Sequence, residues 1–416
     1  MLGINTICTS TVMFTRWSWV RSRITSMYYC VTLVILLTFG FSLPLHAQEQ
    51  EIDSVQRAEL WKQQDFVKAY FVVVEPGGAL YSVFGHACLH MVCPAYGLDY
   101  FYSYESEDAA SRLLTFFAGN LKMGMTAMTA EEYLSGYREE GRGAKEYEIN
   151  LPIDVKRELW RVLDEKVVEG MYLPYDFEAR GCAQACVSIL EETLGETQIE
   201  YGAWSSRFER TRREIANDFA HLHYPWDFLL ITSVVGTEYD KVDTITEKLL
   251  IPSEVAEVWQ NAKYNGEYLL SRESHELLPS KRQQPTTWFT PMMAALLVLI
   301  MAIVAFFIDK PYVDWFVLAI ATMIGAVVSY LVLFSTLPCT NWNWLIIPFN
   351  IFPAIVWKWR KYWSLPYGIM IGIWAMGMLL CPHQLTDYSM IVLAIAFMLI
   401  LMNKRNNKFS LCAKKA

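Results

Sequence analysis

Charged side chains are scarce in this sequence. Asp, Glu, Lys and Arg together make up only 19% of the 416 residues, whereas 54% are hydrophobic. This balance excludes a wholly soluble protein, and the length exceeds that of one average domain. We therefore expect at least two physically different parts.

Basic side chains are especially few in residues 48–283, where 23 Lys and Arg stand against 40 Asp and Glu, a net charge of about −17. This excess of acid excludes nucleic acid as a partner. The local exception is an arginine cluster that either meets lipid phosphates or, as is more common, forms a solvated helix face. Its members are Arg207, Arg210, Arg212 and Arg213.

The first 47 residues have the pattern of a signal peptide. An apolar run over residues 30–41 follows three arginines and precedes a stretch that ends in small residues at Ala47. We expect cleavage after Ala47, and the alternative is a retained N-terminal anchor.

Long hydrophobic runs begin at Trp288. Such runs suit the crossing of about 30 Å of hydrocarbon, and they cover Trp288–Ile308, Trp315–Leu337, Trp344–Trp357, Leu365–Leu380 and Tyr388–Met402. The sequence therefore predicts an all-α membrane domain of five transmembrane helices over residues 287–403. The third run is short for a span.

Lys and Arg are absent from the loops that follow the second and fourth runs. They occur instead after the first, third and fifth, at Lys310, at residues 358–361 and in the basic tail 404–416. Because cytoplasmic loops carry the excess of Lys and Arg, these segments are predicted to be cytoplasmic. With five spans, residues 48–286 then lie on the opposite side, to which a signal peptide would deliver them.

The extracytoplasmic domain is predicted to be α+β. Strands are expected over Phe66–Val74, Ala79–Val92, Tyr100–Tyr104 and Lys145–Leu151. Helices are expected over Ala109–Phe117, Thr129–Arg138, Asp154–Glu169 and Ala183–Leu194. Thr129 and Glu132 form a capping box, and Gly195 closes the last of these helices.

Cys182 stands at the beginning of that last helix. Unpaired N–H groups and the helix dipole lower the pKa of a thiol at this position and favour the nucleophilic thiolate. The same N–H groups suit an oxyanion. Cys186, one turn further on among apolar residues, is interpreted as core. Extracytoplasmic cysteines more often form disulfides, so the helix position alone leaves this alternative open.

His86 is the candidate base for Cys182. It lies in the second predicted strand, where Gly85 permits close approach of the backbone. The alternative is a zinc site, whose ligands would be His86, Cys88, His90 and Cys93. We favour the base and expect no metal or cofactor, because structural zinc sites usually draw their ligands from two separated turns. Candidates to orient the imidazole are Tyr104, Glu105 and Asp108, each equally consistent with an ordinary surface residue.

Several motifs resemble the Lnb-type lipoprotein N-acyltransferases. They are Tyr81–Leu89, Tyr102–Tyr104, Tyr175–Phe177 leading to Gly181-Cys182, Asn341–Leu345 and Pro348–Asn350. The resemblance implies a permuted papain-like (NlpC-like) domain in the periplasm, followed by the five-helix domain in a bacterial inner membrane. It departs from the family pattern at Gly181 and Ala183, which flank the cysteine, and at His90, where an arginine is usual.

The resemblance further implies acyl transfer from a phospholipid donor, through a thioester on Cys182, to the α-amine of a diacylglyceryl-modified lipoprotein. Cys182 and His86 are the predicted catalytic residues, and Ser82 and Tyr104 are candidates for orienting or substrate roles. Asn343 and Asn350, seven residues apart, would share one face of a helix and form part of a lipid site or bond a neighbouring span.

Two alternatives keep the same domain. A papain-like peptidoglycan amidase or peptidase would use the same Cys and His pair, although a wall substrate needs no more than one membrane anchor. A non-catalytic envelope assembly factor would carry Cys182 as a structural residue. Reaction of its thiol with an alkylating reagent would separate this last case from the enzymes.

Overall fold

The computed structural model of the chain describes residues 66–79, 82–107, 112–170, 173–174, 181–195, 199–202, 210–220, 224–241, 249–281, 287–307, 311–380 and 387–402. All of them belong to the larger of two compact units, residues 59–416. The predicted signal peptide and basic tail lie outside the described residues, as do Asp108, Arg207 and the Tyr175–Phe177 motif.

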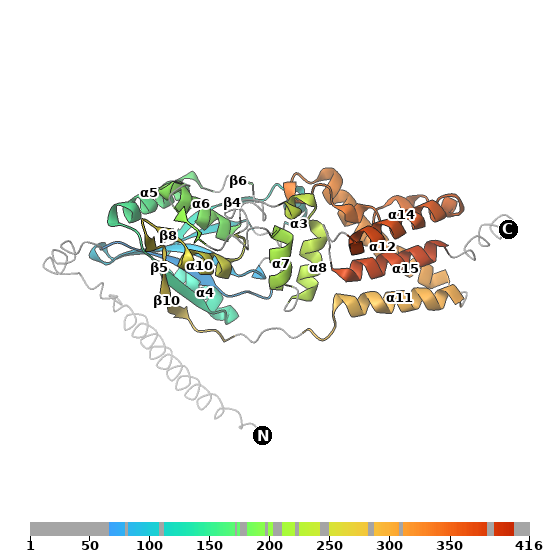
Figure 1. Cartoon of the computed structure of the whole chain (residues 1–416), viewed down its shortest axis with the longest axis horizontal. Coiled ribbons are helices and arrows are strands. Elements are labelled where there is room, and N and C mark those ends of the chain that lie inside the picture. The colour runs from blue at the N-terminus through green and yellow to red at the C-terminus, as the bar shows by residue number, and fades with distance from the viewer. Residues whose placement is uncertain are drawn as a thin grey trace, which may run out of the picture. The chain divides into compact units, whose positions relative to one another are not determined.

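A seven-stranded sheet forms the centre of the N-terminal part (Figure 1). Its order is β10-β5-β1-β2-β3-β4-β6, and every neighbouring pair is antiparallel. The strands are β1 (Lys68–Val74), β2 (His86–Cys93), β3 (Leu98–Ser106), β4 (Lys122–Met128), β5 (Ala144–Ile149), β6 (Leu173–Pro174) and β10 (Leu270–Leu278). A small second sheet contains β7 (Ile199–Glu200), β8 (Lys263–Tyr264) and β9 (Glu267–Tyr268).

Helices cover both faces of the large sheet. Because strand side chains alternate between faces, Phe71 and Val72 of β1 are both fully buried but in different cores. The main core holds Phe71 together with α5 (Ile153–Glu169), α6 (Cys182–Leu194) and α10 (Pro252–Asn261). The other holds Val72 against α4 (Ala130–Glu140). The mixed helix and strand character expected from the sequence is confirmed.

Local signals in the sequence located several of these elements. The capping box of Thr129 and Glu132 opens α4, with both reciprocal hydrogen bonds present. The second predicted strand was extended wrongly at its start, because a tight turn occupies residues 82–85 and β2 begins only at His86. Gly85 closes this turn with φ +86°, and a side chain there would lie 2.5 Å from the Val74 oxygen, so the position requires glycine.

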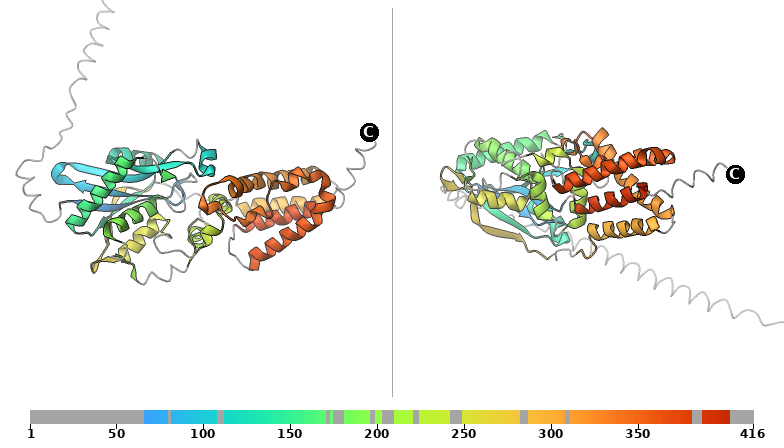
Figure 2. Two further views of the ribbon diagram at one scale, coloured as in Figure 1. Left: turned by 90° about the horizontal axis from the view of Figure 1, so that it is seen from above. Right: turned by 45° about the vertical axis from the view of Figure 1, so that its right-hand side comes forward.

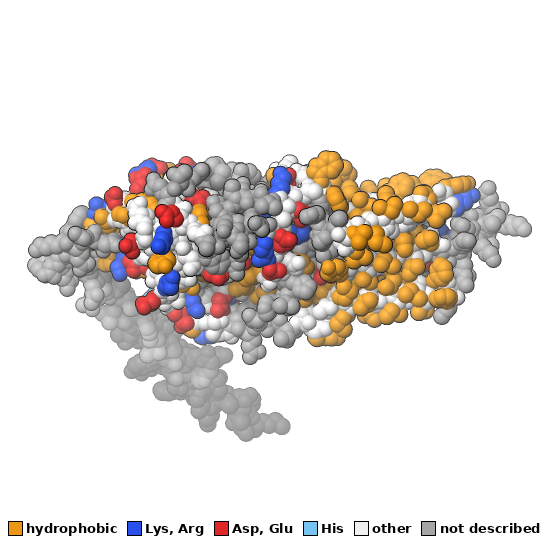
Figure 3. Space-filling model, in the orientation of Figure 1, with side chains coloured by type: hydrophobic (Ala, Val, Ile, Leu, Met, Phe, Trp, Pro, Cys, Tyr) orange, Lys and Arg blue, Asp and Glu red, His pale blue; other side chains and the backbone are white. Residues whose placement is uncertain are grey.

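Four apolar helices dominate the C-terminal part, and Figure 3 shows hydrophobic side chains over most of their visible face. They are α11 (Pro291–Phe307), α12 (Pro311–Phe334), α14 (Arg360–Leu380) and α15 (Tyr388–Met402), shown from two further sides in Figure 2. Two stretches, Tyr312–Phe334 and Trp357–Leu380, are long and apolar enough to cross a membrane, and the other two helices are shorter.

The third hydrophobic run is not a helix, which corrects the sequence prediction. Residues 344–357 contain only one turn each of 3-10 and α-helix, η7 (Trp344–Ile346) and α13 (Phe352–Ile355), before η8 (Trp357–Trp359) begins. Pro348 and Pro353 each lack a backbone N–H and so interrupt a helix ladder. Asn343 and Asn350 therefore do not share a helix face.

This irregular segment nevertheless runs the length of α12. Near its start, the Thr340 hydroxyl donates to the Leu331 oxygen at 3.3 Å, close to the C-terminal end of α12. At its end, the Trp357 ring lies 5.8 Å from that of Trp315, in the first turns of the same helix. The side chain of Asn350 donates to the Ile346 oxygen at 2.8 Å and so satisfies a backbone group that a regular helix would have satisfied itself.

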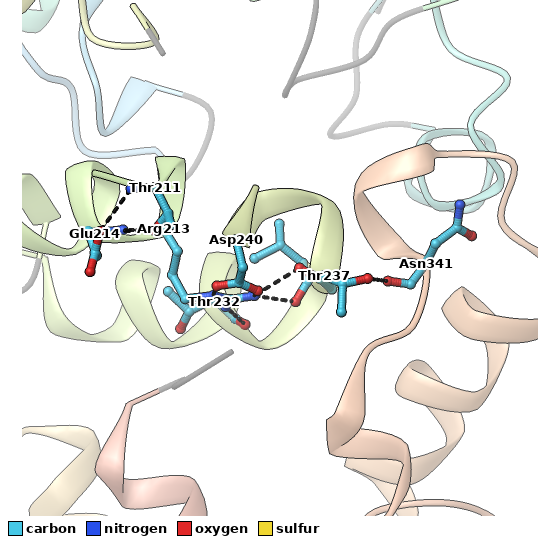
Figure 4. Close-up of polar contacts among 9 residues, drawn as sticks. Thr211, Arg213, Glu214, Thr232, Thr237, Asp240 and Asn341 are labelled. Carbon is cyan, nitrogen blue, oxygen red and sulfur yellow. Dashed lines mark hydrogen bonds and ion pairs between the residues drawn. The ribbon is translucent and has the colours of Figure 1, made fainter. Parts of the chain in front are cut away.

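The loop after α12 is bonded to the region of α7 (Arg212–Ala220), α8 (Pro225–Val234) and η5 (Thr237–Asp240) (Figure 4). The Gly236 and Thr237 N–H groups donate to the oxygens of Cys339 and Asn341, at 2.6 and 3.1 Å. Behind them the buried Arg213 pairs with Asp240 and donates to the Val235 and Gly236 oxygens. We call this set of contacts the loop clamp.

The loop clamp also explains part of the arginine cluster. Arg213 is 4% exposed and bonded within the fold, and Arg210 pairs with Asp218. The charge of Arg213 is therefore paired inside the fold, whereas the pair of Arg210 and Asp218 lies at the surface.

Candidate active site

Cys182 and His86 meet at the end of the sheet. Cys182 is the first residue of α6, after the N-cap Gly181, and His86 is the first residue of β2. The thiol is hydrogen-bonded to the imidazole, and the Ala87 N–H also bonds the sulfur. Cys182 is a free cysteine, so the disulfide alternative does not apply to it. The candidate nucleophile and the candidate base thus lie in contact, although 95 residues separate them in the chain.

A hydroxyl and a carboxylate stand behind the imidazole. The His86 Nε2 and Ser103 Oγ atoms are 2.7 Å apart, and the Ser103 hydroxyl donates to Glu105 Oε1 at 2.7 Å. Glu105 Oε1 is itself 3.6 Å from His86 Nε2. Because Nε2 is hydrogen-bonded to Ser103, Nδ1 is the ring nitrogen that remains to bond the thiol. Both Ser103 and Glu105 project from one face of β3, because they are two residues apart.

The protonation of the pair follows from these contacts. Burial raises the pKa of the Cys182 thiol, but the His86 charge, the hydrogen bond to its ring and the Ala87 N–H outweigh burial, and the pKa falls below its ordinary value. Burial lowers the pKa of His86, yet the Cys182 thiolate and the bond to Glu105 leave it well above its ordinary value. The site therefore favours a thiolate and imidazolium ion pair.

The helix start provides donors beside the sulfur. The first hydrogen bond within α6 runs from the Ala185 N–H to the Gly181 oxygen at 2.9 Å. The N–H groups of Cys182 and Ala183 precede it, so they have no intrahelical acceptor. N–H groups in this position suit the negative oxygen that forms when a thiolate adds to a carbonyl.

Aromatic and basic side chains close the other side of His86. The Tyr133 and Tyr137 rings each lie 6.3 Å from the imidazole ring. Arg142 lies over Tyr137 at 4.8 Å and donates from Nε to the Glu75 oxygen at 2.7 Å. These contacts join the C-terminal end of α4 to the residue that follows β1, so the imidazole has aromatic neighbours on this side and Ser103 and Glu105 on the other.

Two residues predicted from the sequence have other surroundings. Ser82 bonds within its own turn, accepting from the Ala79 N–H and donating to the Ala79 oxygen, and so shapes the segment that leads to His86. Tyr104 packs against the main core, whereas its neighbours Ser103 and Glu105 face the imidazole.

The two predicted asparagines are bonded to groups other than the thiol. Asn343 donates to the Ser233 oxygen at 2.7 Å, which adds to the loop clamp. Asn350 donates to the Ile346 oxygen and to the Tyr367 hydroxyl, both at 2.8 Å, within the C-terminal helices.

The residues of the zinc alternative are not gathered around one point. His90 is bonded through Nδ1 to Glu146 at 2.6 Å and through Nε2 to Asp99 at 2.8 Å. Cys93 belongs to the main core and Cys88 to the core on the opposite face of the sheet. Among the described residues, no cluster of three or more His, Cys, Asp or Glu side chains is arranged to hold a metal ion.

Comparison with known families identifies the domain that carries this pair. Residues 57–215, which include His86 and Cys182, match the family described as the Lnb N-terminal periplasmic domain. This part of the chain is an Lnb domain. The resemblance seen in the His86 and Cys182 motifs is thereby confirmed, whereas the motifs Asn341–Leu345 and Pro348–Asn350 lie beyond the matched residues. The Lnb domain is joined to the apolar helices that follow it. No curated protein and no solved structure matches the chain.

Sequence reasoning missed two features of the Lnb domain's site. Ser103 lay inside the Tyr102–Tyr104 motif but had no role assigned, and the Ala87 N–H leaves no trace in a side-chain pattern. The alternation of β3 was the available signal for Ser103, since a residue two positions from Glu105 shares its face.

Proposed function

We propose that this protein is a lipoprotein N-acyltransferase of a bacterial inner membrane, with its Lnb domain in the periplasm. The observation that carries the proposal is the Cys182 and His86 contact inside an Lnb domain that is continuous with apolar helices. An enzyme whose donor and acceptor are both lipids benefits from residence in the bilayer, which raises the local concentration of each.

The first half-reaction forms an acyl-enzyme. The Cys182 thiolate attacks the ester carbonyl of a phospholipid, and the N–H groups at the start of α6 stabilise the oxyanion. As the carbon–oxygen bond breaks, His86 gives its proton to the departing lysophospholipid oxygen. A thioester on Cys182 and a neutral His86 result, with Glu105 accepting through Ser103 to hold the ring in place.

The second half-reaction transfers the acyl chain. The free α-amine of a diacylglyceryl-cysteine lipoprotein attacks the thioester, and His86 takes the proton that the amine loses. Breakage of the carbon–sulfur bond releases the amide and restores the thiolate and imidazolium pair. The proton that left in the first half-reaction is thus recovered in the second.

The five-crossing topology is part of the same proposal. Four crossings would be α11, α12, α14 and α15, and the third would be the irregular segment that runs along α12. Non-helical backbone at membrane depth needs polar partners and burial in protein. The side chain of Asn350 is such a partner for the Ile346 oxygen, and the segment lies against α12.

The test is mass spectrometry of the purified full chain in lipid nanodiscs with a labelled phospholipid and a diacylglyceryl lipopeptide. We expect a thioester on Cys182, and then an acylated lipopeptide amine. Cys182→Ser and His86→Ala should lose both products. Cys186→Ser should retain them, because burial raises the pKa of that thiol well above its ordinary value.

The outcomes separate the proposal from its rivals. Cleavage of a muropeptide without acylation of Cys182 would make the protein a peptidase. A Cys182 thiol that resists alkylation while the domain remains folded would favour an assembly factor.

A further inference from the structure

Two helices that precede the C-terminal helices in the chain, α3 (Leu113–Ala118) and α8, are bonded to the same end of those helices. The Ala118 oxygen, at the end of α3, accepts from the Thr336 N–H at 3.1 Å and from its hydroxyl at 2.9 Å, just beyond α12. In α8, the Trp226 Nε1 donates to the Phe289 oxygen at 2.8 Å, just before α11. Since α11 begins where α12 ends, both elements lie beside one end of the helical part.

Both elements expose large apolar side chains at that level. Leu114 of α3 is 76% exposed, and Trp226 and Leu230 of α8 are 38% and 52% exposed. The sequence of α3 contains no charged residue, and α8 contains only the half-buried Asp227. In an acidic domain, exposed elements of this composition need a reason.

The apolar surface of α12 reaches the same level. Leu333 and Phe334, in its last turn, are 65% and 68% exposed, and the nearby loop adds Trp342 at 76%. Exposed tryptophans next to an apolar band are typical of the boundary between hydrocarbon and water. The exposed side chains of α3 and α8 therefore extend the apolar surface of α12 at the expected boundary between hydrocarbon and water.

We propose that α3 and α8 lie in the interfacial layer of the bilayer, where their exposed apolar side chains contact phospholipid. This inference rests on the proposed function in so far as that places α11–α15 in a membrane. The partner is a lipid surface, because the surface is apolar and continuous with the exposed face of α12, as in elements that lie in the interface plane.

This placement bears on the active site through α8. The buried face of α8, with Phe228 and the adjoining Tyr224, packs against Val83, and Phe84 packs on the same cluster. Val83 and Phe84 precede His86 in the turn that opens β2. An α8 seated in the lipid surface therefore fixes the height of the imidazole relative to the bilayer.

The test uses the full chain with Cys182→Ser in nanodiscs of ether-linked phospholipid, a fraction of which carries a diazirine close to the glycerol. An ether lipid has no ester to transfer, so labelling is independent of acyl transfer. After irradiation and digestion, we expect about tenfold more label on peptides containing α3 and α8 than on the peptide containing Val168. Val168 of α5 is the matched control, because it is apolar and 86% exposed.

A paired substitution sharpens the result. Leu114→Asp should remove most of the label from the α3 peptide, whereas Val168→Asp should leave it unchanged. Labelling of α12 with none above the Val168 background on α3 and α8 would overturn the inference while leaving the proposed function intact. Absence of label on α12 as well would contradict the membrane placement itself, and acyl-enzyme formation measured separately reports on the reaction.

Discussion

At the level of residues, Glu105 is the group that supports a protonated His86. Burial raises the pKa of Glu105, but its bond to His86 outweighs this, so the carboxylate is charged at neutral pH. A negative charge at this distance favours imidazolium, which in turn favours the thiolate of Cys182. The thiolate and imidazolium pair is populated at pH values above the lowered pKa of Cys182 and below the raised pKa of His86.

We predict that Glu105→Gln slows acylation of Cys182 by about tenfold, since a charged hydrogen bond of this kind is worth about 1.5 kcal/mol. It also lowers the pKa of His86, so the imidazolium is lost at lower pH and the basic limb of the rate profile moves to lower pH. The measurement is the rate of acylation against pH. Glu107→Gln is the control, because Glu107 pairs with Arg112 instead. Superimposable profiles for Glu105→Gln and the parent would rule out this role.

Asn350 tests the interpretation of the irregular segment at the level of one side chain. Its amide is bonded to the Ile346 oxygen and the Tyr367 hydroxyl, which leaves it a structural role. We predict that Asn350→Leu lowers the free energy of unfolding by about 1 kcal/mol and leaves acylation of Cys182 at the parent rate. Thermal unfolding in detergent and acyl-enzyme formation are the two measurements.

Tyr367→Phe completes a double-mutant cycle with Asn350→Leu. The two losses of stability should be less than additive, since both substitutions break the same hydrogen bond. Loss of acylation at full stability in Asn350→Leu would instead make this asparagine part of the lipid site.

At the level of elements, the loop clamp joins the Lnb-domain side to the loop after α12. Gly236 has no room for a side chain, because an added Cβ would overlap the Asn341 carbonyl oxygen. We predict that Gly236→Ala destabilises the protein by about 1–3 kcal/mol, as forced repacking does. It should also speed proteolytic cleavage between α8 and α10.

The control is Gly136→Ala in α4, where an added Cβ meets nothing within 4 Å. This substitution should be neutral or slightly stabilising, since alanine is the better helix former. Equal proteolysis of the two variants would show that the clamp does not hold the loop.

Local chemistry decided which elements the sequence could predict. The helix that begins at Cys182, its closing Gly195 and the capping box of Thr129 and Glu132 all depend on residues close together in the chain. They were found. The start of β2 at His86 was not found, because Gly85 and its turn depend on the approach of the Val74 oxygen from another strand.

The non-local parts of the site were beyond the reach of sequence patterns. The pairing of β10 with β5 joins strands more than 120 residues apart, and no local signal sets it. The hydrophobic run at residues 344–357 had the composition of a span, but Pro348, Pro353 and the bonds of Asn350 set its backbone. Composition predicts that a segment enters an apolar environment more reliably than it predicts the segment's conformation.

At the level of the whole molecule, the charge pattern predicts which ends face which side. Lys358 and Arg360 lie at the same end as the start of α12, since Trp357 packs on Trp315 there. We predict that this end is cytoplasmic. A green fluorescent protein fused after Ala416 should therefore fluoresce, and alkaline phosphatase fused after Gln283 should be active, because that enzyme matures only outside the cytoplasm.

The reverse pattern of the two reporters would invert the orientation. Substitution of Lys358, Arg360 and Lys361 by Gln tests the role of charge directly, because it removes the positive charges that follow the third hydrophobic run. This variant should give mixed reporter signals if those charges set the topology.

The separation of Cys182 from His86 along the chain has a consequence for when the thiol becomes reactive. In a chain that has not yet folded, Cys182 is an ordinary thiol. The imidazole and the Ala87 N–H that lower its pKa belong to β2, which must first pack against α6. Reactivity arrives only once β2 and α6 have docked. The alkylation rate of this single sulfur can therefore report on folding of the domain, because it should be slow in unfolded chains and fast in folded ones.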